Sequence, residues 1–130
     1  NLEAVPANSN LAGAEILLVP QVGREFRLKQ SLETFLEKKQ IQGQRFDYVF
    51  IDCPPSLGLL TINALTAAKE VLVPIQCEYY SLEGLTLLMD TLTQVQKHLN
   101  PNILLSTIVL TMYDSRTRLS NDVAENVKKH

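Results

Sequence analysis

An apolar run at residues 46–52 ends on the carboxylate of Asp52 and leads into Pro54 and Pro55, and this run limits the folds that the chain can adopt. A short run rich in aromatic and β-branched residues, without strict alternation, predicts a strand covered on both faces, as in a parallel sheet. Because proline cannot donate to a sheet ladder, the strand is expected to stop there. Ser56 then stands where the N-cap of a helix is expected.

Hydrophobic periodicity predicts alternating helices and strands along the rest of the chain. The expected helices cover 8–19, 23–40 (ending near Gly43), 57–68 and 81–99, with a last one capped by Ser120; the expected strands cover 70–76 and 103–112, and 2–6 is either a strand or an arm. After residue 45 the order is β-α-β-α-β-α, which is typical of βαβ units. The predicted fold class is therefore α/β with three layers, a mostly parallel sheet with helices on both faces.

The 130 residues include 45% apolar and 20% charged residues, and the net charge is −2. This balance predicts one globular domain over 1–130 and excludes a generally basic nucleic-acid coat, while a local basic patch stays open. No stretch approaches the roughly 18 apolar residues of a membrane span, so no membrane partner is expected. The segment that Asn1 opens is polar and contains proline, with neither a basic leader nor an apolar core, so no signal peptide is expected. Cys53 and Cys77 are expected to be buried, reduced thiols, with a redox pair as the alternative.

Asp52 is the strongest candidate for a catalytic or metal-binding residue, because ligands of a parallel sheet bind beyond the carboxyl ends of its strands. An apolar run ending in aspartate is the Walker B arrangement, in which the carboxylate faces a phosphate-bound Mg²⁺, often through water. Such runs also end many ordinary strands, where the aspartate caps the next turn. The rigid turn at Pro54 and Pro55 favours the metal-binding interpretation, because it fixes where the carboxylate points.

A phosphate cradle of the P-loop kind needs a Gly-rich loop that ends in Gly-Lys. No glycine of this chain precedes a lysine; the five are Gly13, Gly23, Gly43, Gly58 and Gly84. No His, Cys and carboxylate cluster has zinc-ligand spacing, and Ser56 lacks the flanking glycines of a nucleophile elbow. The chain by itself is therefore predicted neither to bind Mg²⁺–ATP tightly nor to hydrolyse it.

Several segments together resemble the ParA/Soj-type chromosome- and plasmid-partitioning ATPases. The sequence FDYVFIDCPPSLG at 46–58 resembles the family's Walker B and switch II stretch, and LLTINALTAA follows it. EYYSLEG at 78–84, KHLNP at 97–101 and LTMYDSRT at 110–117 are similar to further family segments in the same order. The family's P-loop, signature lysines and switch I carboxylate normally precede these segments. The chain therefore resembles the middle and later part of a P-loop NTPase-like domain of the ParA/MinD type, incomplete as given.

The resemblance implies an ATP- and Mg²⁺-dependent switch that forms a homodimer around ATP and binds DNA without sequence preference. It also implies that a ParB-like centromere-binding protein stimulates hydrolysis, and that the protein is cytoplasmic and associated with the nucleoid in a bacterial-type cell. The site residues it implies are Asp52 for Mg²⁺ and catalysis, and Pro54, Pro55, Met112, Tyr113 and Asp114 for the nucleotide.

Arg116 and Arg118 lie on a polar loop and are predicted to contact DNA phosphates in the complete protein. The alternative is that Arg116 pairs with Asp114 or helps to order the nucleotide edge of the site. Two other functions stay open. One is a MinD-like membrane-cycling ATPase, which needs an amphipathic C-terminal helix, and the other is a non-catalytic interaction module that keeps the fold.

Overall fold

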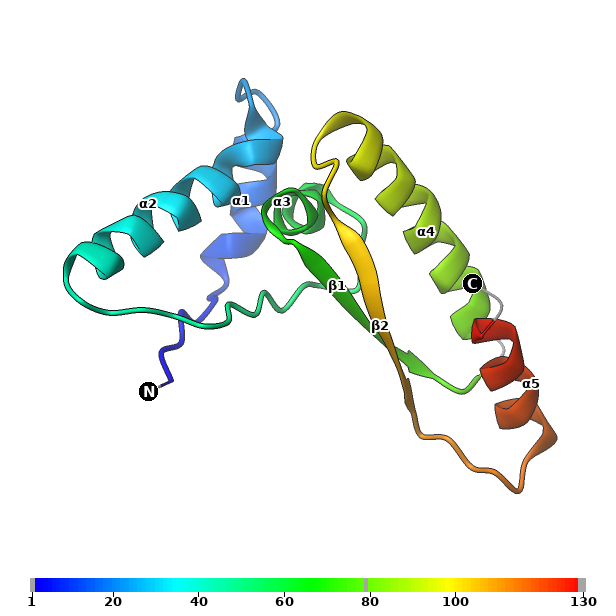
Figure 1. Cartoon of the computed structure of the whole chain (residues 1–130). Coiled ribbons are helices and arrows are strands. Elements are labelled where there is room, and N and C mark those ends of the chain that lie inside the picture. The colour runs from blue at the N-terminus through cyan, green and yellow to red at the C-terminus, as the bar shows by residue number, and fades with distance from the viewer. Residues whose placement is uncertain (1, 79, 129–130) are drawn as a thin grey trace. The chain divides into compact units, whose positions relative to one another are not determined.

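The computed structural model describes residues 2–78 and 80–128 of the chain (Figure 1). The chain divides into two compact units, Asn1–Ala67 and Ala68–His130, and each is described by itself. The described part of unit 1 contains helices, and that of unit 2 contains two parallel strands, each followed by a helix. The single domain expected over 1–130 stays a prediction.

The helices of unit 1 form where the apolar period predicts them. α1 covers Asn10–Leu18, the short 3₁₀ helix η1 covers Arg24–Phe26, α2 covers Arg27–Ile41 and α3 covers Leu59–Ala67. Gly43 follows α2 with a φ of 76°, and its N–H donates to the carbonyl of Gln40 at 3.0 Å. This left-handed glycine ends α2 as predicted, because residues with a Cβ rarely adopt that conformation.

α3 is the most buried element of unit 1, and its buried residues are Thr61, Asn63, Ala64, Leu65 and Thr66. The Nδ2 of Asn63 donates to the carbonyl of Arg24 at 2.9 Å, and its Oδ1 accepts the N–H of Leu28 at 3.1 Å. One buried amide therefore satisfies backbone groups of both η1 and α2. These hydrogen bonds hold the two helices against α3 and leave the Asn63 amide paired, as buried polar groups require.

The strand predicted at 46–52 does not form, and this expectation is wrong for the chain as described. A strand exists only where a neighbour takes its backbone N–H and C=O groups, and none pairs with this segment among the described residues. Tyr48 and Phe50 are 81% and 87% exposed, and their rings stack with centroids 6.3 Å apart. Residues 2–6 are an exposed arm, which is the second of the two predicted alternatives.

α3 begins later than predicted, and Ser56 is not its cap. The carbonyl of Gly58 accepts the N–H of Ile62 at 3.0 Å, so Gly58 occupies the N-cap position. The carbonyl of Ser56 instead accepts a hydrogen bond from the Thr61 hydroxyl at 2.6 Å. Because glycine offers no side-chain oxygen, the free N–H groups at the start of α3 need an acceptor from another element or from water.

Unit 2 is a β-α-β unit followed by one more helix. β1 covers Glu70–Gln76, α4 covers Tyr80–His98, β2 covers Leu104–Thr111 and α5 covers Arg118–Val127. The strands pair in parallel from Glu70 opposite Leu104 to Gln76 opposite Thr111, with one irregularity between Val71 and Leu72. The parallel pairing and the helical crossover predicted from the sequence are confirmed.

The core of unit 2 lies where α4 and α5 pack against one face of the two-stranded sheet (Figure 1). Its buried members are Ile75, Cys77, Leu85, Val123 and Val127, and Val73, Leu82, Met89, Ile108 and Leu110 pack against them. Side chains that point to the other face of the sheet, such as Leu72 and Val109, are 55% and 39% exposed. Among the described residues, no helix is both long enough and apolar enough to cross a bilayer.

Thr117, not Ser120, caps α5. The hydroxyl oxygen of Thr117 accepts the N–H of Ser120 at 3.3 Å. Ser120 is buried in the first turn, and its hydroxyl accepts the N–H of Asp114 at 3.4 Å. Serine and threonine are both good N-caps, so the residue types alone do not decide between the two positions.

Candidate functional site

The loop that carries Asp52 is exposed at its start and anchored at its end. Asp52, Pro54 and Pro55 are all exposed. Proline fixes its own φ, so two in succession stiffen the chain directly after the carboxylate. The end of the loop is tied to α3 through the hydrogen bond from Thr61 to the Ser56 carbonyl. The carboxylate of Asp52 is thus presented to solvent on a stiff turn.

Glu15 supplies the acceptor that the start of α3 lacks, and the sequence interpretation missed this role. Its Oε1 accepts the N–H of Leu59 at 2.6 Å, across 44 positions of sequence. A Cβ built on Gly58 would overlap that same carboxylate. Position 58 therefore favours a residue without a Cβ, because the carboxylate of Glu15 occupies the space that a Cβ would fill. The signal available in the sequence was the glycine before the predicted helix. Glycine has no side-chain acceptor, so a residue from another segment can cap the first N–H groups of that helix.

The two cysteines differ, so the expectation of two buried thiols is half right. Cys77 is 5% exposed and belongs to the core of unit 2, whereas Cys53 is exposed next to Asp52. Partial burial raises the pKa of the Cys53 thiol, and the negative charge of Asp52 raises this pKa further. The neutral thiol is therefore favoured at Cys53, which makes it a slower nucleophile at neutral pH than an ordinary cysteine.

This difference predicts a two-step reaction of the folded 130-residue chain with an aromatic disulfide reagent. Cys53 should react in the native chain, several-fold more slowly at neutral pH than a cysteine in a short peptide. Its rate should keep rising at pH values where the peptide has levelled off, because its raised pKa delays thiolate formation. Cys77 should react only after denaturation. The Cys53→Ser chain should lose the native reaction; a native reaction of both thiols would contradict the assignment.

Hydrogen bonds from α5 hold the loop that follows β2 in place. Met112 has a φ of 53°, an uncommon conformation for a residue with a Cβ, and its side chain is 79% exposed. The Tyr113 hydroxyl donates to Oδ1 of Asn121 at 2.6 Å. The amide Nδ2 of Asn121 donates to the carbonyls of Ser115 and Thr117 at 3.0 and 2.9 Å. Asn121 is a second residue that sequence reasoning missed, and it organises the whole loop.

Arg116 forms the ion pair with Asp114 that the alternative predicts, and its contact with DNA stays a prediction. Its Nε and Nη2 donate to the two carboxylate oxygens at 3.0 and 2.8 Å. Hydrogen bonds from Arg116 lower the pKa of Asp114, and the same pair raises the pKa of Arg116. Arg118 lies 3.7 Å from Asp122, and its side chain is 94% exposed. Exposed ion pairs contribute little free energy, so either arginine can leave its carboxylate and bind a phosphate instead.

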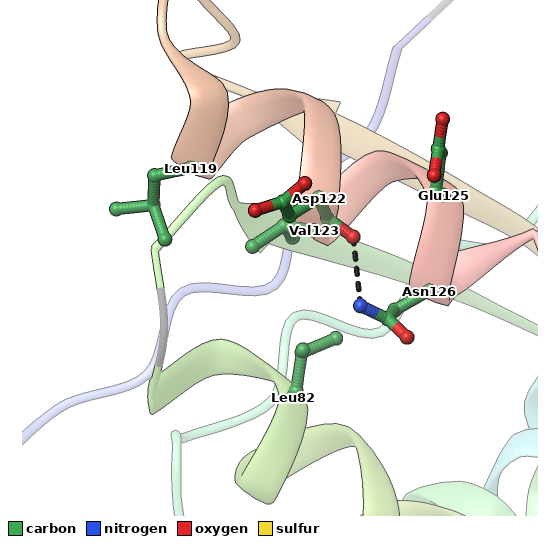
Figure 2. A pocket seen from close by; sticks show the side chains of 6 residues that line it. All are labelled: Leu82, Leu119, Asp122, Val123, Glu125 and Asn126. Carbon is green, nitrogen blue, oxygen red and sulfur yellow. Dashed lines mark hydrogen bonds between the residues drawn. The ribbon is translucent and has the colours of Figure 1, made fainter.

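A shallow recess of about 310 Å³ lies between α4 and α5 in unit 2 (Figure 2). Its lining residues are Leu82, Leu119, Asp122, Val123, Glu125 and Asn126. The Nδ2 of Asn126 donates to the backbone carbonyl of Asp122 at 2.8 Å, so this amide already has a partner within the helix (Figure 2). The recess contains none of the predicted site residues. Among the described residues, no group of three His, Cys, Asp or Glu side chains could hold a metal ion.

The structure thus places the predicted residues in two groups. Asp52, Pro54 and Pro55 belong to unit 1, on one loop before α3. The residues of 112–118 belong to unit 2, on one loop that follows β2 and enters α5. In unit 2 this loop follows the carboxyl end of a parallel strand, which is the edge predicted for ligands.

Comparison with known proteins identifies a family model and several similar proteins. The model of a family described as "AAA domain" matches residues 1–105. Sporulation initiation inhibitor protein Soj of Bacillus subtilis is 55% identical over 130 residues, which are 100% of this chain and 49% of that protein. Chromosome partitioning protein ParA of Myxococcus xanthus is 50% identical over 127 residues, 98% of this chain and 42% of that protein.

Solved structures of cobyrinic acid a,c-diamide synthase from Mycobacterium smegmatis are also similar. One with bound ADP and magnesium matches with a TM-score of 0.82 and 45% identity, over 96% of this chain and 48% of that chain. Another holds an ATP analogue and magnesium and matches with the same TM-score, identity and coverage. Nucleotide and magnesium are therefore bound by proteins of this fold.

A parallel strand pair with a helical crossover, matched to an AAA domain and to nucleotide-bound neighbours, defines a P-loop NTPase-like protein, of which the chain is a part. The chain spans about half the length of the curated relatives that it matches. Within this class, the chain belongs to the ParA/Soj family.

Proposed function

We propose that the full-length protein, meaning this segment with the sequence that flanks it in its own gene, is an ATP-driven partitioning switch. It binds ATP with Mg²⁺, forms a homodimer in that state and binds DNA without sequence preference. A ParB-like centromere-binding protein stimulates hydrolysis, which releases the DNA. The protein acts in the cytoplasm, on the nucleoid. The observation that carries this proposal is the exposed Asp52 on a stiff proline turn, in a chain that aligns over its whole length with relatives named for chromosome partitioning.

Asp52 fits a Mg²⁺ site that is completed by phosphate and water. Mg²⁺ prefers oxygen ligands and keeps several of its waters, so one exposed carboxylate suffices where no larger acidic cluster forms among the described residues. When bound, Mg²⁺ neutralises the charge that develops on the transferred phosphoryl group. The part of Asp52 is to hold the ion in place, and that of Pro54 and Pro55 is to respond to the γ-phosphate beside it.

Met112, Tyr113 and Asp114 are proposed to form the adenine side of the site. Their loop follows the carboxyl end of β2, and α5 holds it through Asn121 and Ser120. The left-handed backbone at Met112 is a strained conformation for this residue type, and such strain is often retained at ligand-contacting positions. The exposed side chain of Met112 is available to pack on the face of a base.

Arg118 and Arg116 are proposed as DNA-phosphate contacts of the ATP-bound dimer. Arg118→Ala in the full-length protein should weaken binding to random-sequence duplex about 3- to 10-fold. Removing one phosphate contact should flatten the slope of log affinity against log salt by about 0.9, and a dimer carries the change twice. Arg116→Ala should have the smaller effect, since Arg116 must first leave Asp114. Gel-shift titrations at several salt concentrations measure both quantities.

The matched control is Lys69→Ala. Lys69 is exposed and directly precedes β1, so it lies at the amino edge of the parallel pair, whereas Arg116 and Arg118 follow its carboxyl edge. The control removes the same charge and should leave affinity and salt slope unchanged. If both arginine variants retain the affinity and slope of the unmodified protein while ATP binding persists, the loop is not a DNA contact.

The MinD-like alternative needs an amphipathic membrane-binding helix with a free apolar face. In α5, Val123 and Val127 are buried in the core of unit 2, so α5 is not such a helix. The non-catalytic module is distinguished from the switch by one measurement, which is ATP turnover by the full-length protein.

A further inference from the structure

We propose that Glu15 is a positioning residue for the Asp52 loop. Its carboxylate, delivered by α1, holds the start of α3 and so sets where the loop before α3 places Asp52. This inference rests on the proposed function, in which Asp52 holds Mg²⁺. It concerns a residue that lies 37 positions away from Asp52 in sequence and reaches the same loop through the fold.

The first observation is the contact itself. Glu15 is half-buried on α1, and its Oε1 accepts the N–H of Leu59, the first residue of α3, at 2.6 Å. A hydrogen bond from a backbone N–H to an anionic oxygen is stronger than one between neutral groups. The amino end of a helix also carries partial positive charge, which favours a carboxylate there. The described residues include no salt bridge to Glu15, so the start of α3 is its compensating partner.

The second observation is the glycine beneath the carboxylate. Gly58 lies between the loop and α3, and a Cβ at this position would overlap Oε1 of Glu15. The carboxylate therefore contacts the backbone of the loop itself and not only the helix. Together with the hydrogen bond from Thr61 to Ser56, this contact fixes the end of the loop on two sides.

The third observation is how short the remaining loop is. Five residues separate Asp52 from Gly58, and Pro54 and Pro55 are two of them. Because Pro54 and Pro55 each have a fixed φ, the loop has fewer rotatable backbone bonds with which to absorb a shift at Gly58 before it reaches Asp52. A metal ligand misplaced by about an ångström can cost a large factor in rate. The geometry thus couples the Glu15 carboxylate to the position of the Asp52 carboxylate.

The test compares variants of the full-length protein in steady-state ATP hydrolysis over a range of Mg²⁺ concentrations. Glu15→Ala should lower kcat about 10-fold and raise the half-saturating Mg²⁺ concentration several-fold, with less than about a 3-fold change in KM for ATP. Glu15→Gln should recover most of the loss, because its amide oxygen can still accept the N–H of Leu59. Glu33→Ala removes an exposed carboxylate from α2 of the same unit and should match the unmodified protein.

A double-mutant cycle tests whether Glu15 acts through this contact. Gly58→Ala should lower kcat when Glu15 is present, because the new Cβ displaces the carboxylate. In the Glu15→Ala background the space is free, so Gly58→Ala should add little. Strongly non-additive effects of this kind are expected for residues in direct contact. If the double variant lowers kcat by the product of the two single-variant factors, the proposal is overturned.

Two further outcomes are decisive. If Glu15→Ala lowers only the thermal unfolding midpoint and leaves kcat and the Mg²⁺ dependence unchanged, Glu15 is structural and the positioning role is wrong. Asp52→Ala in the same assay separates this failure from that of the proposed function. Full turnover by Asp52→Ala would remove the proposed role of Asp52 itself. Abolished turnover in Asp52→Ala together with normal Glu15→Ala kinetics would overturn the positioning role alone.

Discussion

Asp52→Ala in the full-length protein should lower ATP turnover by about 100-fold or more, the range measured when a group that stabilises transition-state charge is removed. The physical reason is that Mg²⁺ loses the carboxylate that positions it, so the charge on the transferred phosphoryl group is less well neutralised. Turnover is measured from phosphate release, with the thermal unfolding midpoint taken on the same sample. The exposed position of Asp52 predicts little change in that midpoint.

Asp47→Ala is the matched control, since it removes an exposed carboxylate from the same segment. It should leave turnover unchanged. The opposing interpretation is that Asp52 only stabilises the turn at the end of its segment. Near-normal turnover in Asp52→Ala, or a loss of turnover matched by a loss of folding, would support that interpretation and contradict the metal-binding role.

The 130-residue chain by itself should show no ATP binding in a calorimetric titration, up to about 1 mM nucleotide with excess Mg²⁺. That limit corresponds to a binding free energy weaker than about 4 kcal/mol. The reason is that none of its glycines precedes a lysine, so the chain as given has no P-loop to wrap and neutralise the phosphates. Asp52 and the loop after β2 cannot replace that cradle.

The full-length protein is the comparison for this titration, and it should bind with one site per chain. Circular dichroism of the 130-residue chain is the control that checks whether a missing signal comes from an unfolded sample. Micromolar binding of ATP to the short chain at one site would contradict the prediction. It would mean that the described residues form a phosphate site without Gly-Lys.

The elements that could be predicted are those whose pattern is local. α2 and α4 follow a helical period over several turns, and their ends are marked by Gly43 and by Asn100-Pro101. β1 and β2 are apolar runs joined through a helix, which leaves parallel pairing as the natural arrangement. In these segments the secondary-structure preferences of neighbouring residues agree with one another, so the sequence alone was sufficient to predict the element.

The errors lie where the outcome depends on a partner distant in sequence. Residues 46–52 have the composition of a buried strand, but a strand needs a neighbour, and none of the described residues supplies one. Ser120 is a good cap by type, but the path of the chain into α5 brings Thr117 to that position. Cys53 resembles Cys77 in sequence, yet only Cys77 ends inside a core.

The alternation of helices and strands, the candidate carboxylate Asp52 and the resemblance to the family could all be read from the amino-acid sequence. These depend on local periodicity and on residues close together along the chain. The fold was needed to reveal that Glu15 caps α3 over Gly58, that Asn63 joins three helices, and that Asn121 organises the loop after β2. Each of these is a hydrogen bond between one polar side chain and a backbone or side-chain group of another segment. Many polar residues could satisfy such a group, so composition and spacing do not select the one that the fold brings within reach.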